Sequence, residues 1–283
     1  MRLDIALISV AAAALFANAG AAQAAPSVQI TDAVVRVIVV PEDRGDIKVE
    51  VVAPNAKLPL SIRTQGDRTI IDGGLDRQIR SCNGGGEKAR VRVRDVGEVT
   101  YDEMPQVVIH TPRAVQLWAD GAVQGSIGRS ASLEMHNSGC SAWTIADVAG
   151  DATLHESGAG SVRMGASDRL DIDLSGASSV HATTVRQGLD AHLSGAGGVR
   201  VDDLSGMMDA RVSGVGQIKI ADGRASTVRA SISGLGGVEF GGVADNLDAS
   251  ISGLGGVRVR EVTGSVRKSI SGGGSVTIGK RPT

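Results

Sequence analysis

"LDASISGLGGVRVREVTGS" occupies residues 247–265, directly after "VRASISGLGGVEFGGVADN" at residues 228–246. Each segment carries a Ser-Gly pair at the same place, and the pair recurs eight times at steps of 19, 18, 19, 19, 20, 19 and 19 residues. A fixed period of this length indicates a solenoid, in which every repeat packs against its neighbours. The repeated pairs are Ser138 and Gly139, Ser157 and Gly158, Ser175 and Gly176, Ser194 and Gly195, Ser213 and Gly214, Ser233 and Gly234, Ser252 and Gly253, and Ser271 and Gly272.

Apolar residues stand at fixed distances from each Ser-Gly pair. In residues 247–265 they are Leu247, Ala249 and Ile251 before the pair, and Val257 and Val259 after it. This spacing of two is typical of a β-strand, because alternate strand side chains face the same side. Stacked repeats would place like residues over like at about 4.8 Å. The sequence therefore predicts an all-β protein, a parallel β-helix (β-solenoid) with about 19 residues per coil, and we favour a right-handed coil.

Other repeat architectures fit less well. Leucine-rich repeats need Leu and Asn columns that this chain lacks, a propeller blade needs a period of about 40, and calcium-binding nonapeptides need about half the observed period. We interpret the Ser-Gly pair as a corner, where glycine permits either a positive φ or a close backbone approach and the serine hydroxyls could form a ladder. A row of serine nucleophiles is the alternative, but no column of bases accompanies the serines.

The two ends of the chain differ from the repeat. Residues 1–24 hold an apolar run that ends in Ala-Gln-Ala, which predicts a signal peptide; an uncleaved membrane anchor is the alternative. Residues 25–113 alternate apolar and polar side chains between turns, so we expect a β-rich capping region before a solenoid domain at 114–283. The solenoid's last coil would be open, and it offers a surface for homo-oligomerisation.

Composition narrows the possible partners and the compartment. The chain of 283 residues has a net charge of −2, which argues against nucleic acid and against electrostatic attraction to an anionic membrane. No stretch after the signal peptide is apolar enough to span a bilayer. We therefore expect an exported protein in the periplasm, on the outer surface or secreted. Cys82 and Cys140 are an even pair, which predicts a disulfide in that oxidising setting, with two unpaired core cysteines as the alternative.

The repeat units resemble a known family. The units "SGAGSV", "SGAGGV", "SGVGQI" and "SGLGGV", preceded by "LDAHL", "MDARV" or "LDASI", are similar to the head GIN domain of putative autotransporter adhesins, a family of unknown function. The resemblance covers roughly residues 110–283. It implies a secreted or cell-envelope β-helical protein from a Gram-negative bacterium, and it brings no catalytic residues with it.

Outward-facing columns of charged and aromatic residues are the candidate chemical sites. Stacked carboxylates could bind a hard cation or serve glycan chemistry, although charge is also usual on a solvated face. They are Asp171, Asp173, Asp190 and Asp209. His136 and His155 could meet across adjacent coils. The aromatic platforms that sugars prefer are scarce in the repeats, which hold only Trp118 and Trp143, and Trp143 occupies an inward column. We therefore predict no catalytic residues, no metal site and no cofactor.

Two further motifs have a binding interpretation and a plainer one. The position six residues after each corner serine forms a basic stripe that could bind acidic glycans or phosphates, or could simply keep the protein soluble. Its members are Arg163, Arg200, Lys219 and Arg258. Arg44, Gly45 and Asp46 form an RGD tripeptide, which suggests either integrin-type adhesion or an ordinary polar turn.

These observations lead to one preferred function and one alternative. We expect an exported, non-enzymatic β-helical scaffold of the cell envelope with an adhesin-like or surface-interaction role, whose partner is an envelope glycan or a surface protein. The alternative is a β-helix that binds envelope glycans or processes polysaccharides. An enzyme would need a groove with converging carboxylates, whereas a scaffold needs only flat faces.

Overall fold

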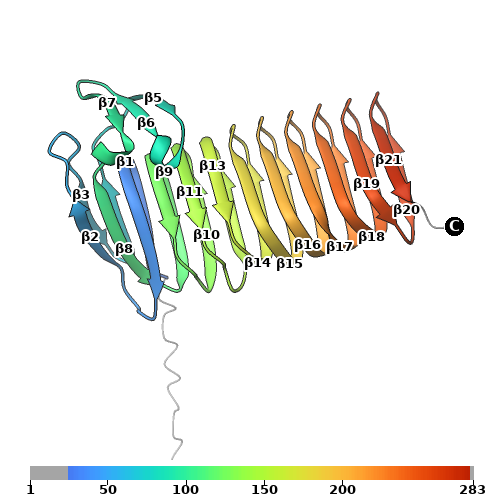
Figure 1. Ribbon diagram of the computed structural model, residues 1–283, viewed down its shortest axis with the longest axis horizontal. Helices are drawn as coiled ribbons and strands as arrows, with labels where there is room; N and C mark the ends of the chain where they lie inside the picture. Colours follow the sequence, from blue (N-terminus) through green and yellow to red (C-terminus); the bar gives the residue numbers. More distant parts are fainter. Residues whose placement is uncertain (1–24, 281–283) are drawn as a thin grey trace, which may run out of the picture.

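The computed structural model describes residues 25–280, so the predicted signal peptide at 1–24 lies outside the described residues. About 70% of the chain is strand, wound into a β-solenoid of about nine turns with about 19 residues per coil. Figure 1 shows the coils stacked side by side along the long axis of the molecule. The predicted fold class is confirmed, while the handedness of the coil stays a prediction.

The repeat region consists of parallel strands separated by the Ser-Gly corners. Each strand from β15 to β18 runs almost from one corner to the next, because the parallel ladder resumes after short irregularities at a second bend. The corners are the thin loops along the upper edge of Figure 1. The strands are β9 (Ala114–Ile127), β10 (Ser132–Asn137), β11 (Cys140–Ile145), β12 (Ala152–Glu156), β13 (Ala159–Met164), β14 (Ser167–Leu174), β15 (Ser179–Leu193), β16 (Gly198–Val212), β17 (Gln217–Ile232), β18 (Gly237–Ile251), β19 (Gly256–Val262), β20 (Val266–Ile270) and β21 (Ser275–Lys280).

The register stacks equivalent residues directly over one another, as the repeat predicts. Ala191, Ala210, Ala230 and Ala249 face one another in successive coils, and all four are buried. Val, Ile and Leu columns line the rest of the interior and form one continuous core. Small interior side chains keep the two sheets close, which is why the chain needs so few aromatic residues.

Corner glycines are required for close backbone approach and not for a positive φ. None of the eight corner glycines, all within the described residues, has a positive φ. A Cβ on Gly234 would instead overlap the carbonyl oxygen of Gly214 in the preceding coil, and the same overlap recurs from coil to coil. Of the two interpretations of the corner, the close approach is therefore the one that the structure supports. Among residues 25–280, no hydrogen bond joins the hydroxyls of successive corner serines.

The N-terminal region continues the solenoid. Strand β1 (Ser27–Glu42) pairs in parallel with β9, and on its other side with β4 (Arg68–Asp72) and β8 (Gln106–Pro112). Strands β2 (Lys48–Ala53) and β3 (Ser61–Gln65) pair antiparallel with β8 and β4 and form the outermost edges at this end. The ladder therefore crosses the expected boundary between 25–113 and 114–283, and that division into two domains stays a prediction.

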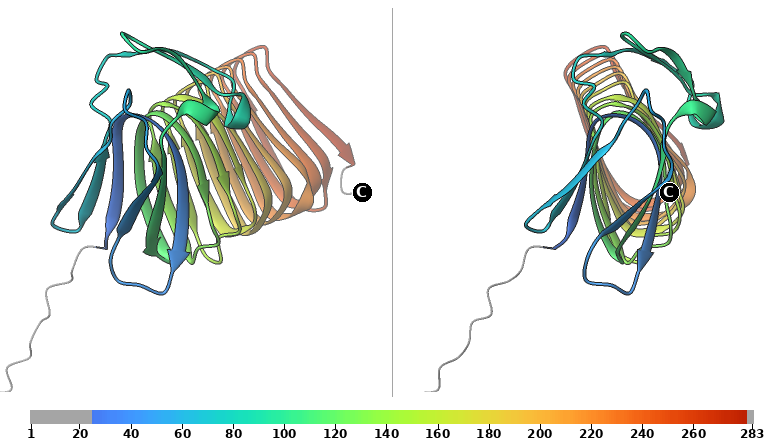
Figure 2. Two further views of the ribbon diagram at one scale, coloured as in Figure 1. Left: turned by 60° about the vertical axis from the view of Figure 1, so that its left-hand side comes forward. Right: turned by 90° about the vertical axis from the view of Figure 1, so that its left-hand side faces the viewer.

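A small antiparallel sheet, which we call the arm, lies outside the stacked coils (Figure 2). It comprises β5 (Ile79–Asn83), β6 (Arg90–Val93) and β7 (Gly97–Thr100), with the short 3-10 helices η1 (Gly86–Lys88) and η2 (Tyr101–Glu103) beside it. The predicted disulfide between Cys82 and Cys140 is present, and it ties β5 to the first Ser-Gly corner. A separate apolar cluster, including Val91 and Met104, packs under the arm.

The C-terminal end of the solenoid is open but crossed by one lysine. Val266 and Ile270 occupy inward columns, yet they are 37% and 44% exposed, since β18 is the one strand of residues 25–280 that pairs with β20. Lys268 stands where the preceding coils have alanine, and its ammonium group donates a 3.3 Å hydrogen bond to the carbonyl oxygen of Val276 in the opposite sheet. An inward-pointing charge at an open end opposes stacking on another apolar surface. Homo-oligomerisation through this end stays a prediction.

Within residues 25–280, no helix has the length and apolar character needed to cross a membrane.

Candidate functional site

Exposed aliphatic residues form a row along the Ser-Gly corners of the later coils. The residue after each corner glycine points outward, and in three successive coils it is large: Val215, Leu235 and Leu254. Their exposed fractions are 59%, 62% and 68%. We call these three residues the corner ridge. An aligned row of exposed Val and Leu is unlike the scattered single apolar residues that are normal on a protein surface.

The backbone amides of the corner ridge are hydrogen-bonded to the preceding coils. The amide of Val215 donates to Gly195, that of Leu235 to Gly214, and that of Leu254 to Gly234, at 3.1 to 3.2 Å. The positions two residues after the ridge carry no charge, at Gln217, Gly237 and Gly256. The ridge is therefore an apolar edge in an uncharged band, supported by a rigid ladder.

The position after each corner glycine also holds the arm, at the first corner of the solenoid. Cys140 occupies the ridge position in the first corner and is bonded to the arm, and Ala159 follows in the next coil. Ala177 and Ala196 continue the column with small side chains until Val215 begins the corner ridge. One edge of the solenoid therefore holds the arm over the early coils and bare apolar side chains over the later ones.

The predicted basic stripe is stacked as expected, but two of its members are paired with carboxylates. Arg200 lies 3.1 Å from Asp202, and Lys219 lies 3.2 Å from Glu239 of the next coil. The hydrogen bond from His181, together with Arg200, lowers the pKa of Asp202 and holds that charge in place. Arg258 stacks over Glu239 in the following coil. These pairs make the stripe close to neutral over its middle coils, and its role in binding stays a prediction.

The outward carboxylates of Asp171, Asp190 and Asp209 form a column, and one arginine pairs with two of them. Arg211 contacts Asp190 at 3.1 Å and Asp209 at 2.7 Å. Partial burial raises the pKa of Asp209, and nearby Asp190 raises it further. Among residues 25–280, no group of three or more His, Cys, Asp or Glu side chains is arranged to hold a metal ion.

Trp118, His136 and His155 form a stack of rings on the outside of the first coils. The centroids of the Trp118 and His136 rings are 5.2 Å apart, and those of His136 and His155 are 4.4 Å apart. The Arg68 guanidinium covers the other side of Trp118 at 5.7 Å. Because both faces of Trp118 are occupied, it cannot serve as a platform for a sugar ring. Trp143 is 1% exposed, as its inward column predicts.

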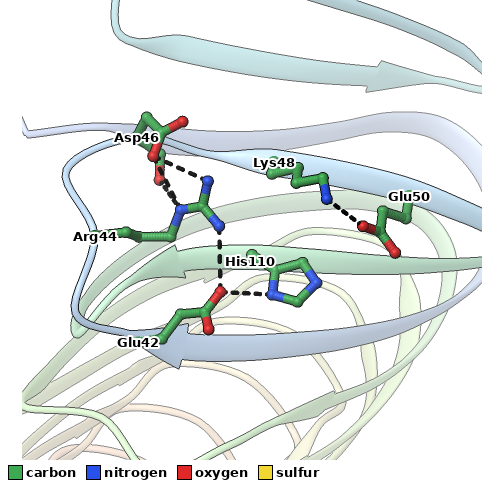
Figure 3. Close-up of polar contacts among 6 residues, drawn as sticks. All are labelled: Glu42, Arg44, Asp46, Lys48, Glu50 and His110. Atoms are coloured by element: carbon green, nitrogen blue, oxygen red, sulfur yellow. Dashed lines mark hydrogen bonds and ion pairs between the residues drawn. The ribbon is translucent and has the colours of Figure 1, made fainter.

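The RGD tripeptide is paired within itself. Arg44 lies 2.9 Å from Asp46 and 3.2 Å from Glu42, and His110 contacts Glu42 at 2.6 Å (Figure 3). The His110 hydrogen bond lowers the pKa of Glu42 and keeps it charged against Arg44. Both charged groups that an integrin-type partner would need are therefore already engaged, which favours an ordinary polar turn.

A shallow groove lies between the arm and the first coils. The groove consists of two hollows beside the arm, each with a volume of about 350 Å³ or less. The hollow that faces β1 is lined by Arg36, Tyr101, Gln124 and Arg163. The Arg36 guanidinium lies 5.0 Å from the Tyr101 ring centroid, so these two side chains contact each other. The hollow facing β1 has one acid among its lining residues, Glu87. The other hollow is lined by Asp32, Asp76 and Asp120, and partial burial together with the charges of Asp120 and Asp76 raises the pKa of Asp32.

Part of the repeat region matches a known protein family. Residues 183–282 match the family described as "Putative auto-transporter adhesin, head GIN domain". The later coils of the solenoid are therefore similar to a head GIN domain. The resemblance in the sequence spans 110–283, so the match covers its later part. Comparison with curated proteins gives no match.

Three solved structures are also similar to this chain. A putative lipid binding protein from Parabacteroides distasonis is similar with a TM-score of 0.50 and 17% identity, covering 89% of this chain and 91% of that one. A putative adhesin from Bacteroides fragilis has a TM-score of 0.48 and 15% identity over 89% and 92% of the two chains. A putative adhesin from Parabacteroides distasonis has a TM-score of 0.48 and 15% identity over 90% and 94%. At this identity the likeness concerns the fold alone.

The corner ridge lies wholly inside the residues that match the head GIN domain. Arg200, Lys219 and Arg258 of the basic stripe also lie in it, whereas Arg163, the arm and the Trp118 stack precede the matched residues. Sequence reasoning followed the inward columns and the charged columns but passed over the position after each corner glycine. A signal was present there, because Val215, Leu235 and Leu254 are aligned in the repeat and are bulky where earlier copies have alanine.

Proposed function

We propose that this chain is an exported, non-enzymatic β-solenoid scaffold of the cell envelope, with an adhesin-like or surface-interaction role. The observation that carries the proposal is the corner ridge, in which three aligned aliphatic side chains are 59 to 68% exposed. Exposed apolar rows of this kind mark interaction surfaces, because burying them against a partner removes them from water. The scaffold holds the row rigid through its ladder, so little conformational entropy is lost when a partner binds.

Retention on bacterial envelope preparations tests this proposal. The variant Leu235→Ser with Leu254→Ser should be retained several-fold less than the native chain, because it removes most of the apolar area of the ridge. Met207 is an exposed residue, 48% accessible, away from the Ser-Gly corners, so Met207→Ser is a matched control. Circular dichroism and the midpoint of thermal unfolding should stay the same in all three proteins. Equal retention of the ridge variant and the control would contradict the proposal.

The groove beside the arm favours the second candidate, binding of an envelope glycan. Gln106, Gln124 and Arg163 line it with groups that hydrogen-bond hydroxyls and carboxylates. A glycan array that includes acidic polysaccharides tests this role directly. Binding that falls tenfold or more in Arg163→Ala, and not in the ridge variant, would favour the groove over the corner ridge.

A further inference from the structure

The corner ridge fits one class of partner better than others. Resting on the surface-interaction role above, we propose that its partner is the surface of a lipid bilayer. Val215, Leu235 and Leu254 would enter the boundary between headgroups and acyl chains, and the flanking Ser and Gly corners would lie at headgroup depth. The solenoid would then rest on the bilayer along its corner edge, with both sheets in water.

The shape of the ridge argues against a protein as its main partner. The three side chains stand on convex corners and follow one another at the strand spacing of about 4.8 Å, so the row is only about 10 Å long. A stable protein interface needs roughly 800 Å² from each partner. A narrow convex row cannot supply that area to a rigid surface. A fluid bilayer adapts to the row and surrounds each side chain.

The backbone of the ridge tolerates the loss of water that insertion brings. Non-helical backbone is costly near hydrocarbon because its amide and carbonyl groups lose their hydrogen bonds to water. At these corners the Val215, Leu235 and Leu254 amides already donate to the preceding coil. The carbonyl groups of Gly214 and Gly234 accept from the following coil. Insertion therefore buries aliphatic side chains while these amide groups keep their hydrogen bonds.

The charges beside the ridge favour a bilayer with anionic lipids. The chain carries −2 overall, but the outward columns that flank the ridge in the last four coils hold five basic residues against three acidic ones. The basic residues are Arg211, Lys219, Arg229, Arg258 and Arg267, and the acidic ones are Asp209, Glu239 and Asp248. This local excess is small, so apolar insertion provides the main attraction and headgroup charge strengthens it.

Vesicle flotation tests the proposal. The chain from Ala25 onward is used, because the apolar run in residues 1–24 would itself bind lipid. Phosphatidylcholine vesicles and vesicles with one quarter phosphatidylglycerol should both carry the native chain upward, the anionic ones more strongly. The variant Leu235→Ser with Leu254→Ser should bind at least tenfold less to both, and Met207→Ser should bind like the native chain.

A second measurement locates the inserted residue. Leu235→Trp should show blue-shifted fluorescence with vesicles, and brominated acyl chains should quench it, whereas Met207→Trp should show neither change. The native background comes from Trp118 and Trp143, both outside the ridge, and is subtracted. Two results would overturn the proposal. The native chain could fail to float with either vesicle while the ridge variant still loses envelope retention, which would leave a protein or glycan partner for the ridge. Alternatively, the ridge variant could float as well as the native chain.

Discussion

The side-chain amide of Asn137 donates a 2.9 Å hydrogen bond to the carboxyl group of Glu156, and both side chains lie inside the solenoid. Later coils have Leu174, Leu193 and Val212 in the same column. One oxygen of Glu156 and the amide oxygen of Asn137 have no partner. Burial raises the pKa of Glu156 to about 7, against the opposing effect of the hydrogen bond from Asn137. The first coils therefore contain a titratable group where the others are apolar.

Stability should depend on pH through Glu156. Its folded pKa of about 7 lies above the ordinary value of 4.5, so the folded state binds this proton more tightly than the unfolded state. The contribution of this group to stability is therefore greatest below pH 4.5 and falls as the pH rises to 7, by about 3 kcal/mol. Urea unfolding of the native chain and Glu156→Gln at pH 5 and pH 8 measures it. The glutamine variant should lose most of this slope, and an equal slope in both proteins would refute the assignment.

Asn137 and Glu156 should be replaceable by apolar residues without loss of stability only when both are changed together. Asn137→Leu alone leaves the Glu156 carboxyl buried without its donor, which should cost about 1–3 kcal/mol at pH 8. Asn137→Leu with Glu156→Leu restores the column of the later coils and should be as stable as the native chain or more so. A double-mutant cycle by urea unfolding gives the coupling. Additive effects of the two substitutions would show that the hydrogen bond contributes nothing.

A methyl group at a corner should destabilise the solenoid. Gly234→Ala places a Cβ against the carbonyl oxygen of Gly214, which cannot move without disturbing the ladder. We expect a loss of about 1–3 kcal/mol in unfolding free energy. Gly237→Ala is the control, since its Cβ would meet only the Gly256 carbonyl oxygen at 3.5 Å. Thermal unfolding of the two variants should separate them, and similar midpoints would rule out close approach as the reason for the glycine.

Removing the disulfide should loosen the arm. Cys82 and Cys140 are 58 residues apart, and closing a loop of that length stabilises a protein by about 2–4 kcal/mol. Cys82→Ser with Cys140→Ser should lower the unfolding free energy by this order and expose the arm to proteases. Limited proteolysis followed by mass spectrometry shows where cleavage begins. Cleavage that begins in the later coils would contradict a local role.

Lys268 should keep the open end from stacking. Lys268→Ala gives the last coil the alanine of the four preceding coils and removes the charge that lies across the core. The variant should associate at concentrations where the native chain sediments as a single chain. Analytical ultracentrifugation over a hundredfold concentration range measures this difference. Lys268→Arg, which keeps the charge, should behave like the native chain.

The repeat made most of the fold predictable, because columns such as Leu247, Ala249 and Ile251 state both the strand spacing and the inward face. The corner conformation was not predictable, since a glycine that needs space and one that needs a positive φ look the same in a sequence. The covered face of Trp118 depends on Arg68, some 50 residues earlier in the chain, and no local pattern joins them. The Asn137 and Glu156 pair was visible as two polar residues in an apolar column, but its burial needed the structure.

The length of the corner ridge depends on how many successive coils carry a large apolar residue at the ridge position. Each coil pairs with its two neighbours, the arm is bonded to the first Ser-Gly corner, and Lys268 lies across the open end. Inserting one 19-residue unit between β17 and β18 should therefore leave both ends unchanged. It should lengthen the apolar edge by one strand spacing, about 4.8 Å. Each duplicated repeat would thus strengthen binding of the corner ridge by a similar amount, because it adds one more ridge residue of the same kind.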